Sequence, residues 1–228
     1  VGEDFGRTIY KIRIPNKVRP DRTDEQPTPE EQSVIDQVIA SLNDAVDRAE
    51  DAEQAIEDMS VSADVRAELR DKYGIPQDKK VFVYGGNLGR PQGIPFLIRC
   101  LEAQKENPDA YFFIVGDGTE YKKLEAWFRE AKPQNAQLQQ RLPKEDYDRL
   151  VAACDVGLIF LDHRFTIPNF PSRLLSYMQA CLPVLCCTDP NTDVGTVCDE
   201  GGFGWKCECN NAQAFGAVVE QALDSDLV

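Results

Sequence analysis

The 228 residues, of which 42% are hydrophobic and 28% charged, have the composition of an ordinary globular protein and can bury a substantial core. No apolar run approaches the roughly 20 residues that span a bilayer, and the first residues lack the basic start and apolar centre of a signal peptide. The net charge of −14 disfavours nucleic acid and anionic lipid as partners. It does not exclude a small phosphorylated ligand that binds at one local site.

Eight cysteines are present, but none forms a C-x-x-C pair and His163 is the only histidine. The sequence therefore argues against a structural zinc site. Most of the cysteines lie in apolar runs such as residues 184–187, where a thiol acts as a small buried hydrophobic group. We expect free thiols and a cytoplasmic protein.

Residues 1–27 contain a strand-like piece, residues 8–14, followed by a polar loop with prolines. A remnant of a preceding domain is one interpretation of this segment, because the chain does not begin with methionine.

An acidic helical segment, residues 28–74, follows. It opens with a capping box and a proline at the first helical position, Thr28-Pro29-Glu30-Glu31. Residues 21–71 hold 16 Asp and Glu against four Arg and no Lys. Apolar residues in steps of three and four form a heptad seam: Ile35, Val38, Leu42, Ala45, Ala49, Ala52, Ile56 and Met59. A helix packed on the body of this domain and a helix that packs against a partner chain or a missing domain both fit this pattern.

A second helix, residues 63–73, is predicted to end at Gly74, with Pro76 beyond it. From residue 75 onward, strand and helix patterns alternate. We expect strands near residues 81–84, 111–115, 137–141, 156–161, 183–187 and 204–207. We expect helices near residues 94–106, 119–131, 144–153, 172–181, 194–199 and 211–223. Several strands are continuously apolar, which indicates burial on both faces. The prediction is an α/β fold in residues 75–228: a doubly wound, Rossmann-like parallel sheet of about six strands that binds ligands at the carboxyl ends of its strands.

A glycine-rich turn follows the first of these strands and reads Gly85-Gly86-Asn87-Leu88-Gly89-Arg90-Pro91-Gln92-Gly93. Between a strand and a helix, such a turn brings backbone N–H groups close to an anion, and the helix N-terminus adds positive potential. Arg90 favours a phosphate ligand. A tight turn that uses glycine only for its positive φ is equally compatible with this segment alone.

Two further loops at strand ends carry suggestive residues. One is the segment Val115–Glu120, in which glycines flank Asp117 before a helix. The other runs from Asp162 to Pro171 and leads into Ser172 and Arg173. Ser172 is a good N-cap residue, but an arginine in a first helical turn is unfavourable unless an anion lies nearby.

Two nucleotide-binding motifs can be tested directly. A dinucleotide fingerprint requires G-x-G-x-x-G and an acid about 20 residues further on. Here the turn is G-G-N-L-G, and Asp117 lies 31 residues beyond Gly86, so the sequence argues against NAD. A P-loop is excluded because no G-K-[ST] occurs.

Four segments in order carry a family resemblance: G-N-L-G-R-P-Q-G, V-G-D-G-T-E-Y-x-x-L, L-P-K-E-D-Y-D-R-L-V-A-A-C-D-V-G-L-I and P-S-R-L-L-S-Y-M-Q-A-C-L-P-V-L. Together they resemble the donor-binding, C-terminal half of a family 4 glycosyltransferase of the GT-B fold. The resemblance covers about residues 75–224.

The resemblance implies a site for a nucleoside-diphosphate-sugar. The turn from Gly86 to Gly93 and the segment at Ser172 and Arg173 would hold the diphosphate, and backbone groups at Arg141 and Leu142 would contact the base. Asn87 and Gln92 stand where the family has arginine and lysine, so Arg90 would supply the missing charge. We therefore expect the side chains of Arg90 and Arg173 to converge on one pyrophosphate pocket, as the catalytic groups that stabilise the leaving nucleoside diphosphate.

The chain also departs from the family. The paired glutamates of the family would fall on Pro168 and Ser176, which leaves recognition of the donor ribose to the Ser176 hydroxyl. Cys181 and Leu182 stand where glycine and lysine are common. His163 opens the third loop, where it is either a donor contact or a solvated side chain.

The function that the resemblance implies is retaining transfer of a sugar, of the hexosyltransferase type, to a glycan or lipid-linked acceptor in bacterial polysaccharide biosynthesis. No metal or cofactor is expected, because cationic side chains would stabilise the leaving group. The acceptor domain would be missing from this chain, so we expect donor binding without efficient transfer, and the intact enzyme could lie peripherally at the membrane. Two alternatives remain: a non-catalytic nucleotide-sugar binding module, and an interaction protein that self-associates through the heptad segment.

Overall fold

The computed structural model describes residues 36–37, 39–41, 43, 62–164 and 170–225. The chain divides into two compact units, residues 1–51 and 52–228. In the first unit, the six described residues are helical. The predicted strand at 8–14, the capping box at 28–31 and every position of the heptad seam lie outside the described residues.

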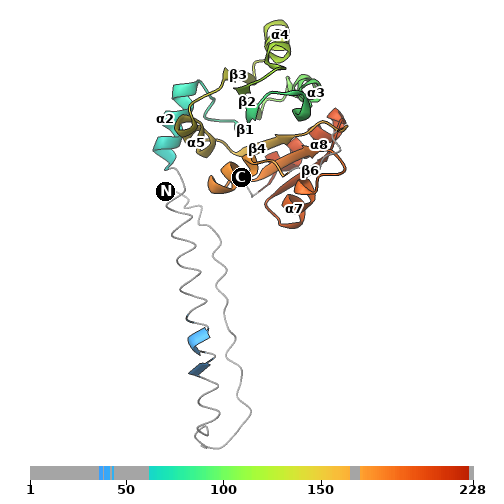
Figure 1. The fold of residues 1–228 in the computed structure, drawn as a ribbon. Coiled ribbons are helices and arrows are strands. Elements are labelled where there is room, and N and C mark those ends of the chain that lie inside the picture. The colour runs from blue at the N-terminus through green and yellow to red at the C-terminus, as the bar shows by residue number, and fades with distance from the viewer. Residues whose placement is uncertain (1–35, 38, 42, 44–61, 165–169, 226–228) are drawn as a thin grey trace, which may run out of the picture. The chain divides into compact units, whose positions relative to one another are not determined.

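The second unit is built on a parallel sheet of six strands, shown in Figure 1. The strands are β1 (Lys80–Asn87), β2 (Ala110–Asp117), β3 (Ala136–Gln140), β4 (Val156–Phe160), β5 (Val184–Thr188) and β6 (Gly204–Glu208). Their spatial order is β3-β2-β1-β4-β5-β6, and every pair is parallel. The predicted doubly wound α/β fold is confirmed, and the order reverses between β1 and β4.

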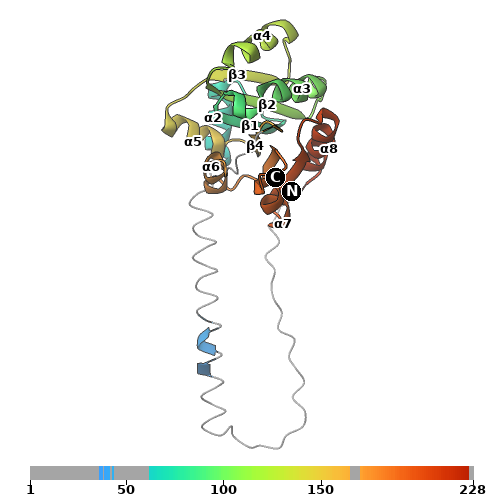
Figure 2. The same cartoon turned by 45° about the vertical axis from the view of Figure 1, so that its right-hand side comes forward.

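Helices cover both faces of this sheet. They are α2 (Ala63–Tyr73), α3 (Ile94–Gln104), α4 (Tyr121–Ala131), α5 (Lys144–Ala152), α6 (Arg173–Gln179), α7 (Val194–Glu200) and α8 (Ala212–Leu223), with a 3₁₀ turn, η1, at Arg90–Gln92. The core beneath α3 and α8 is rich in aromatic rings, including Phe82, Phe112 and Phe215. A second core lies beneath α5, α6 and α7. Figure 2 shows α3 and α8 apart from α5 and α6, on the two sides of the strands.

The first strand is longer than the sequence predicts. Gly85, Gly86 and Asn87 were expected to lie in a turn, but they continue β1 and pair with Val115, Gly116 and Asp117 of β2. Glycine at 116 makes this close pairing possible, since a Cβ there would lie 2.0 Å from the carbonyl oxygen of Gly86. The turn that leads to α3 therefore starts at Leu88.

Tyr177 fills the point where β1 and β4 separate. Only two residue pairs join these strands, Phe82 with Val156 and Val83 with Gly157. The Tyr177 hydroxyl lies 3.2 Å from the carbonyl oxygens of both Val83 and Leu158, one on each strand. Glycine at 157 leaves room for the ring, because a Cβ there would lie 2.5 Å from it. The tyrosine thus brings a hydrogen-bond donor to the backbone carbonyls at the point where the two strands separate.

Helix α2 is tied to the amino end of the sheet by a buried ion pair. Arg70 donates to Asp155 at 2.6 Å and to the carbonyl oxygen of Ala153 at 2.9 Å. Asp155 also accepts from the backbone N–H of Val81 and pairs with Arg66. The helix begins at Ser62, whose hydroxyl accepts from Val65, and ends at Gly74 with φ +67°. The predicted stop at Gly74 is confirmed.

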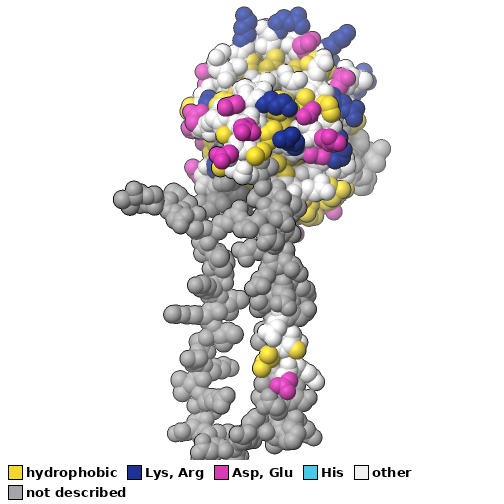
Figure 3. Space-filling view, turned by 90° about the vertical axis from the view of Figure 1, so that its left-hand side faces the viewer, with side chains coloured by type: hydrophobic (Ala, Val, Ile, Leu, Met, Phe, Trp, Pro, Cys, Tyr) yellow, Lys and Arg dark blue, Asp and Glu magenta, His cyan; other side chains and the backbone are white. Residues whose placement is uncertain are grey.

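All eight cysteines lie in the described part of the chain and carry free thiols, six of them buried. Cys181, which stands where the family commonly has glycine, adopts a left-handed φ of +53°. Figure 3 shows lysine, arginine, aspartate and glutamate side chains intermixed on the face that carries α2 and α5. Within the described residues, no helix is long and apolar enough to cross a membrane.

Candidate functional site

An open cleft lies at the carboxyl ends of β1 and β4, where the strand order reverses. Its volume is about 460 Å³. Such a switch point is where open α/β sheets bind ligands, because the loops of neighbouring strands run in opposite directions there. The lining residues are Gly85, Gly86, Asn87, Gln92, Tyr147, Leu161, Phe170, Pro171, Ser172, Arg173 and Ser176.

Arg173 is the cation of this cleft. Its guanidinium lies over the ring of Tyr84, with Cζ 4.4 Å from the ring centroid, a cation–π contact. One guanidinium nitrogen, Nη1, is buried and has no hydrogen-bond partner among the described residues. Burial lowers the pKa of Arg173, but the hydroxyls of Tyr84, Tyr177 and Tyr147 outweigh burial and raise it, so the group is charged. A buried guanidinium nitrogen without a hydrogen-bond partner is costly, and an anion in the cleft would remove that cost.

Two glycines at the end of β1 make room for this arrangement. Gly86 has φ +121°, which favours glycine, and a Cβ there would lie 3.6 Å from Nη2 of Arg173. A Cβ on Gly85 would lie 1.9 Å from the Tyr147 hydroxyl oxygen. From the sequence, these glycines fitted either the approach of an anion to the backbone or a tight turn with positive φ. In the structure, they also admit the side chains of Arg173 and Tyr147.

The remaining turn is held by its own hydrogen bonds. The hydroxyl of Tyr84 donates to the carbonyl oxygen of Asn87 at 3.0 Å, and the side-chain oxygen of Gln92 accepts from the N–H of Gly89 at 3.2 Å. Gly93 has φ +62° and begins α3. These contacts fix Asn87 and Gln92 at the edge of the cleft, where both line it.

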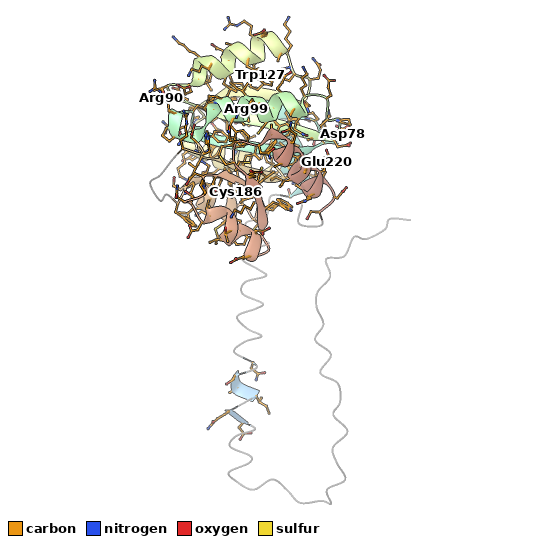
Figure 4. All side chains as sticks on the ribbon, turned by 90° about the vertical axis from the view of Figure 1, so that its right-hand side faces the viewer. Asp78, Arg90, Arg99, Trp127, Cys186 and Glu220 are labelled. Atoms are coloured by element: carbon orange, nitrogen blue, oxygen red, sulfur yellow. The ribbon has the colours of Figure 1, made fainter. Side chains whose placement is uncertain are left out.

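The structure does not bring Arg90 into the cleft. Its side chain is 89% exposed, and its Nε lies 3.9 Å from a carboxylate oxygen of Glu120, which is itself buried. Figure 4 shows Arg90 at one end of the sheet and Asp78, which precedes β1, at the other. The two predicted arginines therefore share the carboxyl end of the sheet, but the described side chains do not converge. Arg90 lies on the 3₁₀ turn η1, none of whose residues is buried, and its side chain extends into solvent there.

Three other predicted residues also lie outside the cleft lining. Gly93 is buried against the backbone of Asp162. Arg141 is exposed directly after β3, and Leu142 is half-buried against the core beneath α5. Contacts of these residues with a ligand stay predictions.

Ser172 and Ser176 line the cleft on either side of Arg173. Ser172 occupies the N-cap position of α6, but its side chain makes no capping hydrogen bond. Ser172 therefore does not cap the helix with its side chain. It is an exposed residue that lines the cleft. Pro168 lies outside the described residues. The Nδ1 atom of His163 lies 3.6 Å from a carboxylate oxygen of Asp162, and His163 does not line the cleft.

Sequence reasoning missed the three tyrosines around Arg173: Tyr84, Tyr147 and Tyr177. Tyr84 and Tyr177 read as core residues within apolar runs, and they are fully buried. Tyr147 lies in the third of the family-like segments, in which no role was assigned to it. A glycine pair following an apolar strand was the available signal, since it implies that large side chains from elsewhere occupy that space.

Comparison with known proteins shows that most of the described domain matches a protein family. The family described as glycosyl transferases group 1 matches residues 65–227. The protein named "Probable glycosyltransferase WbjE", from Pseudomonas aeruginosa, is 30% identical over 149 residues, which cover 65% of this chain and 37% of that protein. WcaI of Escherichia coli K12, named as a glycosyl transferase of colanic acid biosynthesis, is 28% identical over 165 residues, 71% of this chain and 39% of its own length. The chain thus spans about two-fifths of these relatives.

Solved structures share the fold. HepE of Anabaena, determined in complex with UDP and glucose, gives a TM-score of 0.60 at 20% identity, over 75% of this chain and 45% of that one. WaaG, a glycosyltransferase involved in lipopolysaccharide biosynthesis, gives 0.55 at 20% identity, over 74% and 45%. At these identities the likeness concerns the fold alone.

Proposed function

Because this chain belongs to the glycosyl transferases group 1 family, we propose that its α/β domain binds the diphosphate of a nucleoside-diphosphate-sugar. The intact protein would then transfer the sugar, with retention of configuration and as a hexosyltransferase, to a glycan or lipid-linked acceptor. The acceptor site would belong to a second domain outside this chain. Support for the ligand class comes from HepE, whose fold is similar and which was determined with UDP-glucose.

The observation that carries this proposal is the guanidinium of Arg173. It is charged, partly buried at the ligand-binding end of the sheet, and leaves Nη1 without a partner in the described structure. None of the residues that line the cleft in the described structure is acidic. Diphosphate oxygens would supply the missing hydrogen-bond acceptor through charge-assisted bonds, which are stronger than bonds between neutral groups.

The other lining residues suit a polar ligand. The amides of Asn87 and Gln92 and the hydroxyls of Ser172 and Ser176 surround Arg173 and can hydrogen bond to phosphate or sugar oxygens. We propose that Ser176 contacts the ribose, and that Gly86 and Gly93 allow close approach of the backbone. We keep the base contact at Arg141 and Leu142 as part of the proposal. No metal is required if the guanidinium offsets the charge of the leaving group.

Arg90 is proposed as an auxiliary cation. Its side chain is almost fully exposed, so rotation away from Glu120 toward a bound diphosphate is sterically open. Its pair with Glu120 is weak at this exposure. The charge of the ligand could therefore draw it to the rim of the cleft.

A non-catalytic binding module is the second candidate. It is favoured by the absence of a carboxylate among the described lining residues, because recognition of a ribose diol usually benefits from an acidic acceptor. A module of this kind would bind the donor without transferring the sugar. Formation of a glycosylated product by the full-length protein separates the two candidates, and the anomeric configuration of that product, measured by NMR, tests retention.

Calorimetry with the full chain tests the site. Wild type is titrated with UDP, GDP, ADP and dTDP, and the Arg173→Gln variant with whichever binds. Loss of a charge-assisted bond worth about 1.5–3 kcal/mol predicts affinity at least about tenfold weaker. Arg129→Gln, on the exposed face of α4, is the matched control and should bind like wild type. If wild type binds none of the nucleoside diphosphates, the proposed function is wrong.

A further inference from the structure

Tyr147 reaches the cleft from α5, on the opposite side of β1 from the ring of Tyr84. Its ring lies directly against Gly85, at a position that any side chain on residue 85 would occupy. The hydroxyl therefore lies next to the end of β1, and Tyr147 lines the same cleft as Arg173.

The hydroxyl of Tyr147 has no partner in the described structure. Its oxygen is buried and forms no hydrogen bond, and the same holds for Nη1 of Arg173. Burial and the adjacent Tyr177 hydroxyl raise the pKa of Tyr147, but the two hydroxyls form no hydrogen bond, and that of Tyr177 lies 3.2 Å from the carbonyl oxygens of Val83 and Leu158. Buried polar atoms without partners are rare and destabilise the free protein. Two of them, from different helices, line one cleft.

We infer that Tyr147 is a second anion-binding group, whose hydroxyl donates a hydrogen bond to an oxygen of the anion that pairs with Arg173. The inference rests on the proposed function, since it requires a phosphate-bearing ligand in the cleft. A neutral donor beside a guanidinium complements a diphosphate, which presents several acceptor oxygens in a short span.

The surroundings keep this hydroxyl a donor. Burial, together with the adjacent Tyr177, raises the pKa of Tyr147, so its proton is retained at neutral pH. Both unpartnered atoms are covered in the ligand-free structure. Ligand binding therefore requires a small shift of side chains at the rim, where Phe170 and Ser172 are exposed.

The Tyr147→Phe variant removes the hydroxyl and keeps the ring over Gly85. Calorimetry on the full chain would compare inorganic pyrophosphate, the nucleoside diphosphate that binds best and its parent nucleoside. We expect affinity for both phosphorylated probes to fall about tenfold, and nucleoside affinity to stay unchanged. The ligand-free melting temperature should stay the same or rise by up to about 3 °C, because an unpartnered buried hydroxyl is removed.

Tyr73→Phe is the matched control. Tyr73 lies at the end of α2 with its ring against Phe113 and does not line the cleft. It should leave the affinity for all three probes unchanged.

Three outcomes would overturn the inference. Wild-type affinity of Tyr147→Phe for pyrophosphate and the nucleoside diphosphate would remove Tyr147 from the site and leave the role of Arg173 intact. A lower ligand-free melting temperature, with nucleoside affinity reduced as much as that of the diphosphate, would mean that the hydroxyl is structural. Failure of wild type to bind either phosphorylated probe would overturn this inference and the proposed function together.

Discussion

At the scale of single residues, the site depends on which cation is held in place. Arg90 and Arg173 were both expected at the diphosphate, and both lie at the same end of the sheet. Arg173 rests on the ring of Tyr84, whereas Arg90 extends toward Glu120 and solvent. Arg173 lines the cleft as a result, and Arg90 does not. The sequence pattern does not specify in which direction either arginine side chain extends.

The ion pair at the end of β4 gives a pH-dependent prediction. Arg164 donates to both carboxylate oxygens of Asp162, at 2.8 and 2.9 Å, which lowers the pKa of Asp162 to about 2. Because this folded pKa lies below the unfolded value of about 3.9, the pair stabilises the fold above pH about 4. That contribution is lost as pH falls toward 2. It is small, since Arg164 is exposed.

Thermal unfolding measured from pH 7 to pH 2 checks this. Wild type should unfold at a higher temperature than Arg164→Gln near neutral pH, and the gap should close between pH about 4 and about 2. A gap that is constant across the range would show that the arginine acts through packing, and not through the carboxylate.

At the scale of elements, α2 is joined to the Rossmann-like domain through one arginine. Arg70 is only 3% exposed in its side chain and satisfies Asp155 together with backbone carbonyls before β1. Arg70→Met would leave Asp155 with one charged partner, the more exposed Arg66, and the backbone N–H of Val81. Because it removes one partner of a buried pair, we expect the free energy of unfolding to fall by about 3 kcal/mol.

Urea denaturation measures this loss, and Arg66→Met is the matched control. Arg66 bonds the same carboxylate but is 36% exposed, so its removal should cost less than about 1 kcal/mol. Equal losses in the two variants would contradict the assignment of Arg70 as the main link between α2 and the sheet.

At the scale of the whole molecule, self-association through the acidic segment stays a prediction. The heptad seam lies outside the described residues, and its only support is the alternation of apolar positions from Ile35 to Met59. If the segment joins two copies, replacing Val38 and Leu42 together by glutamate should convert a dimer to a monomer in sedimentation experiments. A wild-type chain that sediments as a monomer at high micromolar concentration would rule this out.

Most of the fold could be predicted because its signals are local. Buried strands can be recognised in the sequence as apolar runs, and helices can be recognised by their periodicity and their caps. Each element expected between residues 63 and 223 is therefore present, within a few residues of its predicted bounds. The prediction that Gly85, Gly86 and Asn87 form a turn was wrong because their conformation is not decided locally. Whether glycines extend a strand or turn depends on the neighbouring strand, and here the close approach of Gly116 decides it.

The sequence by itself determined the order of strands and helices, the family and the end of the sheet where a ligand should bind. These follow from residue periodicity, glycine positions and ordered motifs, all of which are properties of neighbouring residues. Only the tertiary structure decided that Arg173 enters the cleft, that Arg90 extends away, and that Tyr147 joins from another helix. Such convergence depends on how α5 and α6 pack across β1, and packing is set by contacts between residues far apart in the chain.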